Sequence, residues 1–313
     1  MRGIWAGARR AGVGVLGCLL LGPWAVCHAA SLRFCDRPPE LAAGQQDTLL
    51  RFGAIIKDEL ERSGQPMALV ARSGLDLGRF GVRYSHAGLS LKASRNTPWS
   101  VRQLYYACDE KRPRLYDQGM AGFLLGTDDP AVGYVSVLLL PAAQAEALER
   151  VALDDRQVLR LLGATYSANA YAFSERYQNC NQWVAELLAT AWGSLGEESH
   201  RSDPIDLRLR AQQWLKDRGY LPSVLDVGNP LLMWAGLFVP WVHSDDHPRE
   251  DLAEQRYQVS MPASIEAFVH ATLPQATRIE FCHAGKQVVI RRGWEPIAEG
   301  CHPRADDTVV TLE

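Results

Sequence analysis

The order of hydrophobic periodicities along the chain constrains its fold more than any other feature. A helical pattern over residues 40–64 repeats apolar side chains at three- and four-residue spacing. Alternating or continuous apolar runs then predict strands at 67–74, 81–91, 99–108 and 131–141. Further helical patterns and a closing strand pair follow at 142–163, 174–193, 202–220, 262–274 and 280–301. A helix, then strands, then helices, then a strand pair indicates an α+β fold rather than a doubly wound sheet.

The first thirty residues have the order of a secretory signal. Arg9 and Arg10 precede the apolar run 11–22, and small residues lead to a cut that we place after Ala29, with Ala30 as the alternative. The run is shorter than the roughly 20 residues that span a bilayer, so we expect no transmembrane helix in the mature chain. We therefore predict a signal peptide at 1–30 and a periplasmic location. The net charge of −3 and the lack of a basic stripe argue against nucleic-acid binding.

Five of the seven cysteines remain after removal of the signal, and exported chains usually pair their thiols. Cys282 and Cys301 lie in one C-terminal unit and are predicted to form a disulfide. The second predicted pair is Cys35 with Cys108, although sequence alone cannot fix the connectivity. Cys180 is left over as a free thiol.

Cys180 occupies the first turn of a predicted helix. Asn179 is a good N-cap, and Gln182 is placed to complete a capping box. The apolar stripe that would bury this helix is formed by Trp183, Val184, Leu187, Leu188 and Ala191. Unpaired N–H groups in a first turn favour an anion, so we expect a lowered pKa for the Cys180 thiol. The same N–H groups are suited to an oxyanion hole.

A nucleophilic cysteine needs a base and a group that orients the base. His86 lies in a predicted strand between small residues, which would allow a substrate or a helix to approach closely. Gln103, on the next strand, is the candidate for holding the second ring nitrogen, with Tyr105 as the fallback. A structural histidine and a merely buried cysteine are the alternative interpretations. Because a strand histidine and a helix-start cysteine occur together in an exported chain with one unpaired cysteine, we favour a Cys180–His86–Gln103 site.

The strand sequence SHAG followed by a later helix that starts with cysteine resembles the circularly permuted NlpC-type papain-like superfamily. The mature chain also resembles a bacterial family catalogued as domain of unknown function 2145. The segments that carry this likeness are RYSHAGLS, LYDQGMAGFLLG, RYQNCNQWVAELL and RRGWEPIAEGC.

The superfamily resemblance implies a permuted papain-like core, in which an antiparallel sheet packs on the cysteine-bearing helix. We place this domain at 31–225 and a C-terminal extension at 226–313. The implied activity is a cysteine hydrolase or acyltransferase acting on an amide or acyl ester, such as a cell-envelope peptide or lipid, without a cofactor. Gln103 stands where His, Asn or Glu is commoner, and the segment after the cysteine helix has no counterpart in the superfamily.

Two other functions compete with this hypothesis. His243, Asp245, Asp246 and His247 offer four donors for a metal, although such a loop is more often solvated. A non-catalytic envelope-binding module is the other alternative, with the apolar segment 228–241 as a groove or a peripheral membrane contact. For that segment we favour a core helix that ends at Pro240.

Overall fold

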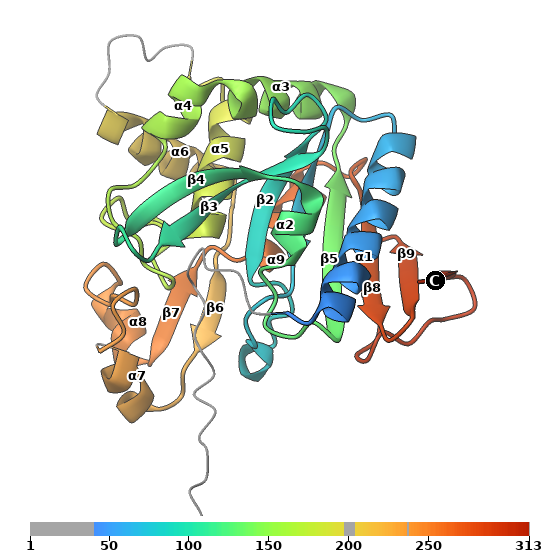
Figure 1. Cartoon of the computed structure of the whole chain (residues 1–313). Helices are drawn as coiled ribbons and strands as arrows, with labels where there is room; N and C mark the ends of the chain where they lie inside the picture. Colours follow the sequence, from blue (N-terminus) through green and yellow to red (C-terminus); the bar gives the residue numbers. More distant parts are fainter. Residues whose placement is uncertain (1–40, 197–203, 237, 313) are drawn as a thin grey trace, which may run out of the picture. The chain divides into compact units, whose positions relative to one another are not determined.

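The computed structural model describes residues 41–196, 204–236 and 238–312, and within them the central feature is an antiparallel sheet. Eight strands pair in the order β10-β9-β8-β5-β1-β2-β3-β4 (Figure 1). Their bounds are β1 Met67–Arg72, β2 His86–Leu91, β3 Ser100–Ala107, β4 Arg112–Gln118, β5 Val132–Leu139, β8 Thr277–Ala284, β9 Gln287–Arg292 and β10 Thr308–Thr311. The predicted α+β class with a large antiparallel sheet is confirmed.

Helices cover both faces of the sheet (Figure 1). One face packs on α1 (Ala43–Arg62) and α2 (Met120–Leu124). The other packs on α3 (Ala142–Leu153), α5 (Cys180–Trp192) and α9 (Pro262–Thr272). Side chains alternate between the two faces of a strand, and both faces of β1 are covered. Its residues from Met67 to Ala71 are therefore all apolar and buried.

Several elements differ from the sequence expectation. Among those not predicted are the helices Met120–Leu124 and Arg249–Ala253 and the strands Ser223–Asp226, Arg256–Val259 and Thr308–Thr311. Strand β4 was not predicted, because its sequence RPRLYDQ is polar and begins next to a proline. The helical pattern at 142–163 is divided into α3 and α4 (Asp155–Arg160). Asp154 ends α3 with an extended backbone (ψ 98°), and its carboxylate accepts the N–H groups of Arg156 and Gln157 as the N-cap of α4.

The C-terminal strands belong to the same sheet as the predicted core. β8 pairs with β5, and β9 pairs with β8 around a turn at Gly285, as expected for a strand pair. The predicted disulfide between Cys282 and Cys301 is present, with a Cα–Cα distance of 5.7 Å. Cys108 is also disulfide-bonded, but its predicted partner Cys35 and the predicted signal peptide lie outside the described residues.

A smaller unit packs beside the end of the main sheet. It contains the strand pair of β6 (Ser223–Asp226) with β7 (Arg256–Val259) and the short helices α7 (Pro230–Gly236) and α8 (Arg249–Ala253). Helix α6 (Pro204–Asp217) packs instead on α5 of the main core. The apolar cluster of the smaller unit joins Leu225, Tyr257 and Met261 to the loop residues Leu77 and Phe80. This cluster later forms one wall of the candidate site.

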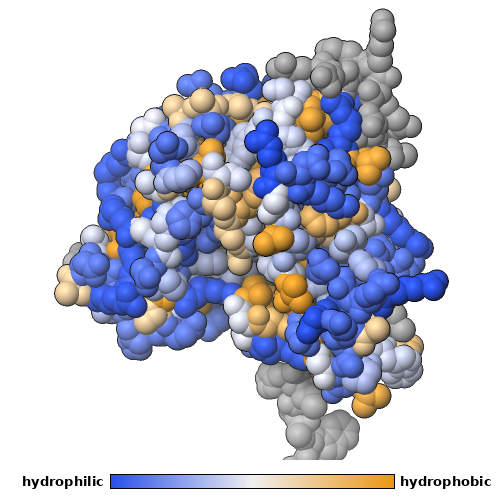
Figure 2. Space-filling view, turned by 180° about the vertical axis from the view of Figure 1, so that it is seen from behind, coloured by the Kyte–Doolittle hydropathy of each residue, from blue (hydrophilic) through white to orange (hydrophobic). Residues whose placement is uncertain are grey.

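The segment around α7 is exposed, so the prediction of a core helix is wrong. Leu231 is 73% exposed, Trp234 61% and Phe238 71%. The helix lies in the smaller unit, and its Met233 packs on the apolar cluster of that unit. Seen from behind the view of Figure 1, hydrophilic residues dominate the surface and hydrophobic residues form small groups among them (Figure 2). No helix in the described ranges combines the length and apolar character needed to cross a bilayer.

Candidate active site

Two of the three predicted site residues line one cavity of about 190 Å³ at the end of the sheet. Cys180 and His86 both line it, and each is 6% exposed. The walls are mostly apolar and come from the small C-terminal unit and the loop after β1. The wall residues are Leu75, Leu77, Phe80, Leu225, Val227, Val242, Tyr257 and Met261.

Helix α5 begins at Cys180, as predicted, and Asn179 is its N-cap. The Asn179 side chain accepts the Gln182 N–H at 2.6 Å. The Gln182 side chain does not complete a capping box; it donates instead to backbone carbonyls of residues 171, 172 and 174. The predicted apolar stripe is buried, and the helix is surrounded by protein from Cys180 to Ala191.

Asn181 ties the start of α5 to the strand that carries His86. Its Oδ1 accepts the Ala87 N–H at 2.9 Å, and its Nδ2 donates to the Ser85 carbonyl at 3.2 Å. These two backbone groups flank His86, while β2 begins its pairing with β3 only farther along, at Leu89. Asn181 directly follows Cys180, so these bonds hold the start of α5 against the backbone on either side of His86.

The polar residue predicted to orient His86 does so. The Gln103 Oε1 lies 2.8 Å from His86 Nε2, and Gln103 Nε2 donates to Gln118 Oε1 at 2.8 Å. An amide oxygen can only accept, so Nε2 carries the proton and Nδ1 holds the lone pair of the neutral ring. The fallback residue Tyr105 stacks on the imidazole with ring centroids 4.5 Å apart. The ring is thus held with Nδ1 available as a base.

Cys180 and His86 are not hydrogen-bonded to each other among the contacts of the described residues. Tyr166 also lines the cavity, and its hydroxyl acts to lower the pKa of the Cys180 thiol. Cys180 is a free, buried thiol, as predicted from the cysteine count. The structure therefore places Cys180 and His86 in one cavity without a hydrogen bond between the thiol and the imidazole.

The expected lowering of the Cys180 pKa is wrong. Burial raises the pKa of the thiol to about 11, although the Arg72 charge, the Asn181 N–H and the Tyr166 hydroxyl each act to lower it. The helix start does supply N–H groups, but it lies inside the protein, where the loss of water outweighs them.

We expect alkylation of Cys180 to be slow at neutral pH. A pKa of about 11 against an ordinary 9.0 leaves about a hundredfold less thiolate at pH 7. Iodoacetamide labelling, followed by peptide mass spectrometry, should show a rate that rises steadily up to about pH 11. Urea-unfolded protein should label at least a hundredfold faster at pH 7, and equal rates would contradict the burial argument.

The pKa of His86 is lowered to about 3, first by burial and then by the Arg72 charge, against the opposing bond to Gln103. The unfolded chain binds this proton between about pH 6.5 and pH 3, whereas the folded chain does not. Stability therefore falls as the pH drops through that interval, by up to about 4–5 kcal/mol. Urea titrations at pH 7 and pH 4 should show this loss, and a His86→Gln variant should show less of it. His283, whose pKa is lowered to about 4, accounts for part of the remaining loss.

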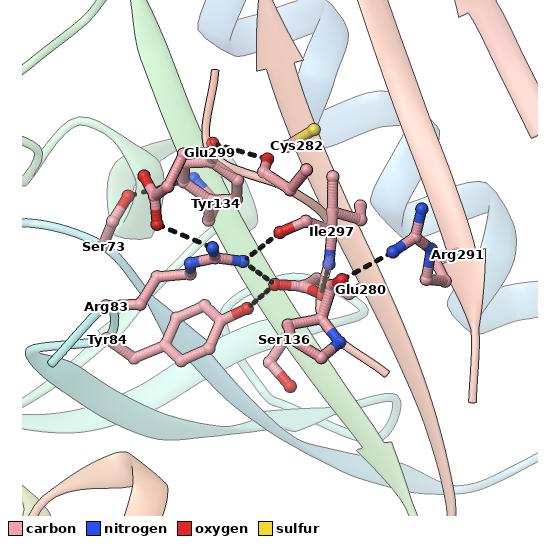
Figure 3. Close-up of polar contacts among 12 residues, drawn as sticks. Ser73, Arg83, Tyr84, Tyr134, Ser136, Glu280, Cys282, Arg291, Ile297 and Glu299 are labelled. Carbon is pink, nitrogen blue, oxygen red and sulfur yellow. Dashed lines mark hydrogen bonds and ion pairs between the residues drawn. The ribbon is translucent and has the colours of Figure 1, made fainter. Parts of the chain in front are cut away.

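A buried charge cluster anchors the backbone just before His86. Glu280 on β8 is fully buried and accepts from Arg83, Arg278, the Tyr84 hydroxyl and the Ile297 N–H. Arg83 also bonds the Ile297 carbonyl at 2.7 Å and reaches the exposed Glu299 (Figure 3). The cluster thus links the C-terminal loop and β8 to the residues that lead into β2.

The four residues of the alternative metal site contact other groups of the protein, and His247 Nε2 also lies 3.7 Å from Asp246 Oδ1. His247 Nε2 bonds the Asn169 carbonyl at 2.7 Å, and Asp246 accepts the Tyr171 N–H. His243 stacks on Tyr177, and Asp245 pairs with Arg176. Within the described ranges, no group of three or more His, Cys, Asp or Glu side chains is arranged to hold a metal ion.

Sequence reasoning missed three residues of this site: Arg72, Tyr166 and Asn181. Asn181 had a signal, since it is polar in an otherwise apolar helix and adjoins the cysteine. Tyr166 and Arg72 had none, because only the fold brings them to the cavity from a loop and from the end of β1.

Fold and cavity together define an α+β protein with a buried cysteine and an amide-oriented histidine at the end of an antiparallel sheet. The family model described as "Uncharacterized protein conserved in bacteria (DUF2145)" matches residues 59–269. The match covers more than half of the chain, so the chain belongs to this family, as predicted. It includes Cys180, His86 and Gln103. No curated protein and no solved structure matches the chain.

Proposed function

We propose that this protein is an exported cysteine hydrolase or acyltransferase that acts on an amide or an acyl ester. The observation that carries the proposal is the shared cavity, in which Cys180 faces the same space as a histidine held by Gln103. A buried thiol left free in a chain with a disulfide supports a role other than cross-linking. The periplasm and a cell-envelope substrate remain the proposed setting.

The proposed reaction begins when the Cys180 thiol gives its proton to His86 Nδ1 and its sulfur attacks the substrate carbonyl carbon. The carbonyl π electrons move to oxygen, which backbone N–H groups at the start of α5 stabilise. The tetrahedral intermediate collapses as the bond to the leaving nitrogen or oxygen breaks, and His86 returns the proton to that atom. Water or another nucleophile, deprotonated by His86, then attacks the thioester, and Cys180 leaves with the proton.

Two groups near the Cys180 sulfur stabilise its negative charge in this scheme. The Arg72 guanidinium and the Tyr166 hydroxyl both favour the thiolate over the thiol. Since burial disfavours the thiolate in the free protein, we place proton transfer within the attack itself and not before substrate binding.

A permuted papain-like core is also part of the proposal. The histidine strand precedes the cysteine helix in the chain, an antiparallel sheet packs on that helix, and Gln103 orients the imidazole from the next strand. These three features support a likeness to the NlpC-type superfamily.

Hydrolysis of p-nitrophenyl butyrate and of its amide analogue, N-butyryl p-nitroanilide, tests the proposal. We expect Cys180→Ala to abolish turnover and Cys180→Ser to lower it at least about a thousandfold, because a hydroxyl is a far poorer nucleophile at this position. Leu221→Ala, at a side chain 78% exposed, is the control and should keep full activity. Turnover that survives in Cys180→Ala would contradict the proposal.

A second candidate is a non-catalytic envelope-binding module. It is favoured by the exposed apolar group of Leu231, Trp234 and Phe238, of which the last two rings are 4.9 Å apart. If this group contacts a membrane surface, lipid vesicles should sediment the protein, and Trp234→Ser should reduce the bound fraction. A Cys180→Ala variant that keeps every cellular function would favour this candidate over the enzyme.

A further inference from the structure

Arg72 is a charged residue at the base of the apolar cavity. It is the last residue of β1, its Cα is paired with that of His86 across the strands, and its side chain is 4% exposed. Of the described residues that line the cavity, it is the one Lys, Arg, Asp or Glu. Its charge acts on both Cys180 and His86, so it lies beside the reacting groups.

The partners of Arg72 are all uncharged. Nη1 donates to the Ser73 carbonyl at 3.2 Å, Nη2 donates to the Tyr105 hydroxyl, and the guanidinium lies 5.4 Å from the centroid of the Phe123 ring. Nε is buried without a hydrogen-bond partner. No carboxylate in the described parts of the chain forms an ion pair with this guanidinium.

Two glycines make room for the side chain. A Cβ added at Gly74 would lie 2.3 Å from Nη1, and one added at Gly126 would lie 2.2 Å from Nη2. The backbone on both sides is therefore shaped around the guanidinium. By contrast, other buried arginines of this chain have carboxylate partners: Arg208 pairs with Glu186 and Arg291 with Asp307.

We propose that Arg72 binds a carboxylate group of the ligand that enters this cavity. A buried charge is costly unless it is paired, and the open cavity is the direction from which a partner can come. This inference rests on the proposed function only in taking that ligand to be the substrate or the product. The specificity that follows is for an acyl or peptide compound with an apolar body and one carboxylate close to the scissile bond.

A carboxylate fits the site better than a phosphate does. One guanidinium matches one negative charge, whereas a phosphate dianion would leave charge uncompensated among apolar walls. A bound carboxylate also offsets the positive charge that disfavours the protonated form of His86. Binding would therefore make His86 a stronger base when a substrate is present, and it would at the same time offset the Arg72 charge that favours the Cys180 thiolate.

Isothermal titration calorimetry with pentanoate and pentanamide tests the inference directly. The two probes share their carbon chain and differ in charge, so no variant is needed for the first comparison. We expect pentanoate to bind the full-length protein at least tenfold more tightly than pentanamide. In Arg72→Met the preference should disappear, and Arg72→Lys should retain part of it. Pentanoate should also move the NMR titration of His86 toward higher pH.

Equal binding of the two probes, no binding of pentanoate, or an undiminished preference in Arg72→Met would overturn the inference. Tighter binding of inorganic phosphate than of pentanoate would overturn the assignment to a carboxylate. None of these measurements depends on turnover. If pentanoate binds through Arg72 while Cys180→Ala retains turnover, the proposed function fails and the anion subsite remains.

Discussion

Replacement of Glu280 by glutamine should lower the free energy of unfolding by about 3–5 kcal/mol. Glu280 is fully buried and accepts bonds from two guanidinium groups, a tyrosine hydroxyl and a backbone N–H. The glutamine amide would present an –NH₂ group to these donors. It would leave Arg83 with only the exposed Glu299, and Arg278 with only Glu266, as a carboxylate partner. Urea denaturation monitored by tryptophan fluorescence measures the change.

The matched control is Glu299→Gln, because Glu299 pairs with the same Arg83 but has an 87% exposed side chain. An exposed pair contributes little, so this variant should lose less than about 1 kcal/mol. If both variants lost the same amount, the central place given to Glu280 in anchoring the residues before His86 would be wrong.

Replacement of Gln103 by leucine should lower kcat/KM for an ester substrate by about 10²–10³-fold with little change in KM. Without the amide oxygen, Nε2 loses the acceptor that fixes the neutral tautomer, and Nδ1 no longer holds its lone pair toward the cavity. Gln103→Glu keeps an acceptor at this position and adds a negative charge, so it should retain activity better and raise the pKa of His86.

The pH profile separates orientation from a general loss of structure. Gln103→Glu should shift the acid limb of kcat/KM upward by a measurable amount, whereas Gln103→Leu should lower the whole profile. Equal activity of Gln103→Leu and the parent protein would show that the amide does not orient the base.

The sequence predicted most of the elements that carry the site. The stripe from Trp183 to Ala191 predicted the buried helix, and its N-cap placed Cys180 in the first turn. Alternation placed Gln103 and Tyr105 on one face of the strand that follows the His86 strand, since residues two apart share a face. The free thiol of Cys180 was predicted because five cysteines remain after removal of the signal and four of them were assigned to two pairs.

The rest depends on properties that a linear pattern does not contain. The pKa of Cys180 depends on how much protein covers the start of α5, and periodicity indicates which helix face is buried but not whether its end is covered. An apolar run usually predicts a buried segment, but Trp234 and Phe238 are exposed. Arg72 reaches the cavity only because β1 and β2 pair in the register that sets it opposite His86.

The rate at which p-nitrophenyl butyrate acylates Cys180 at pH 7 tests the central claim most directly. This rate is measured by intact mass after rapid quench, in the parent protein and in His86→Ala. If His86 accepts the thiol proton during attack, the parent should gain one butyryl group at Cys180 at least about a hundredfold faster than the variant. Equal rates in the two proteins, or a label on other residues in place of Cys180, would contradict a cysteine–histidine site.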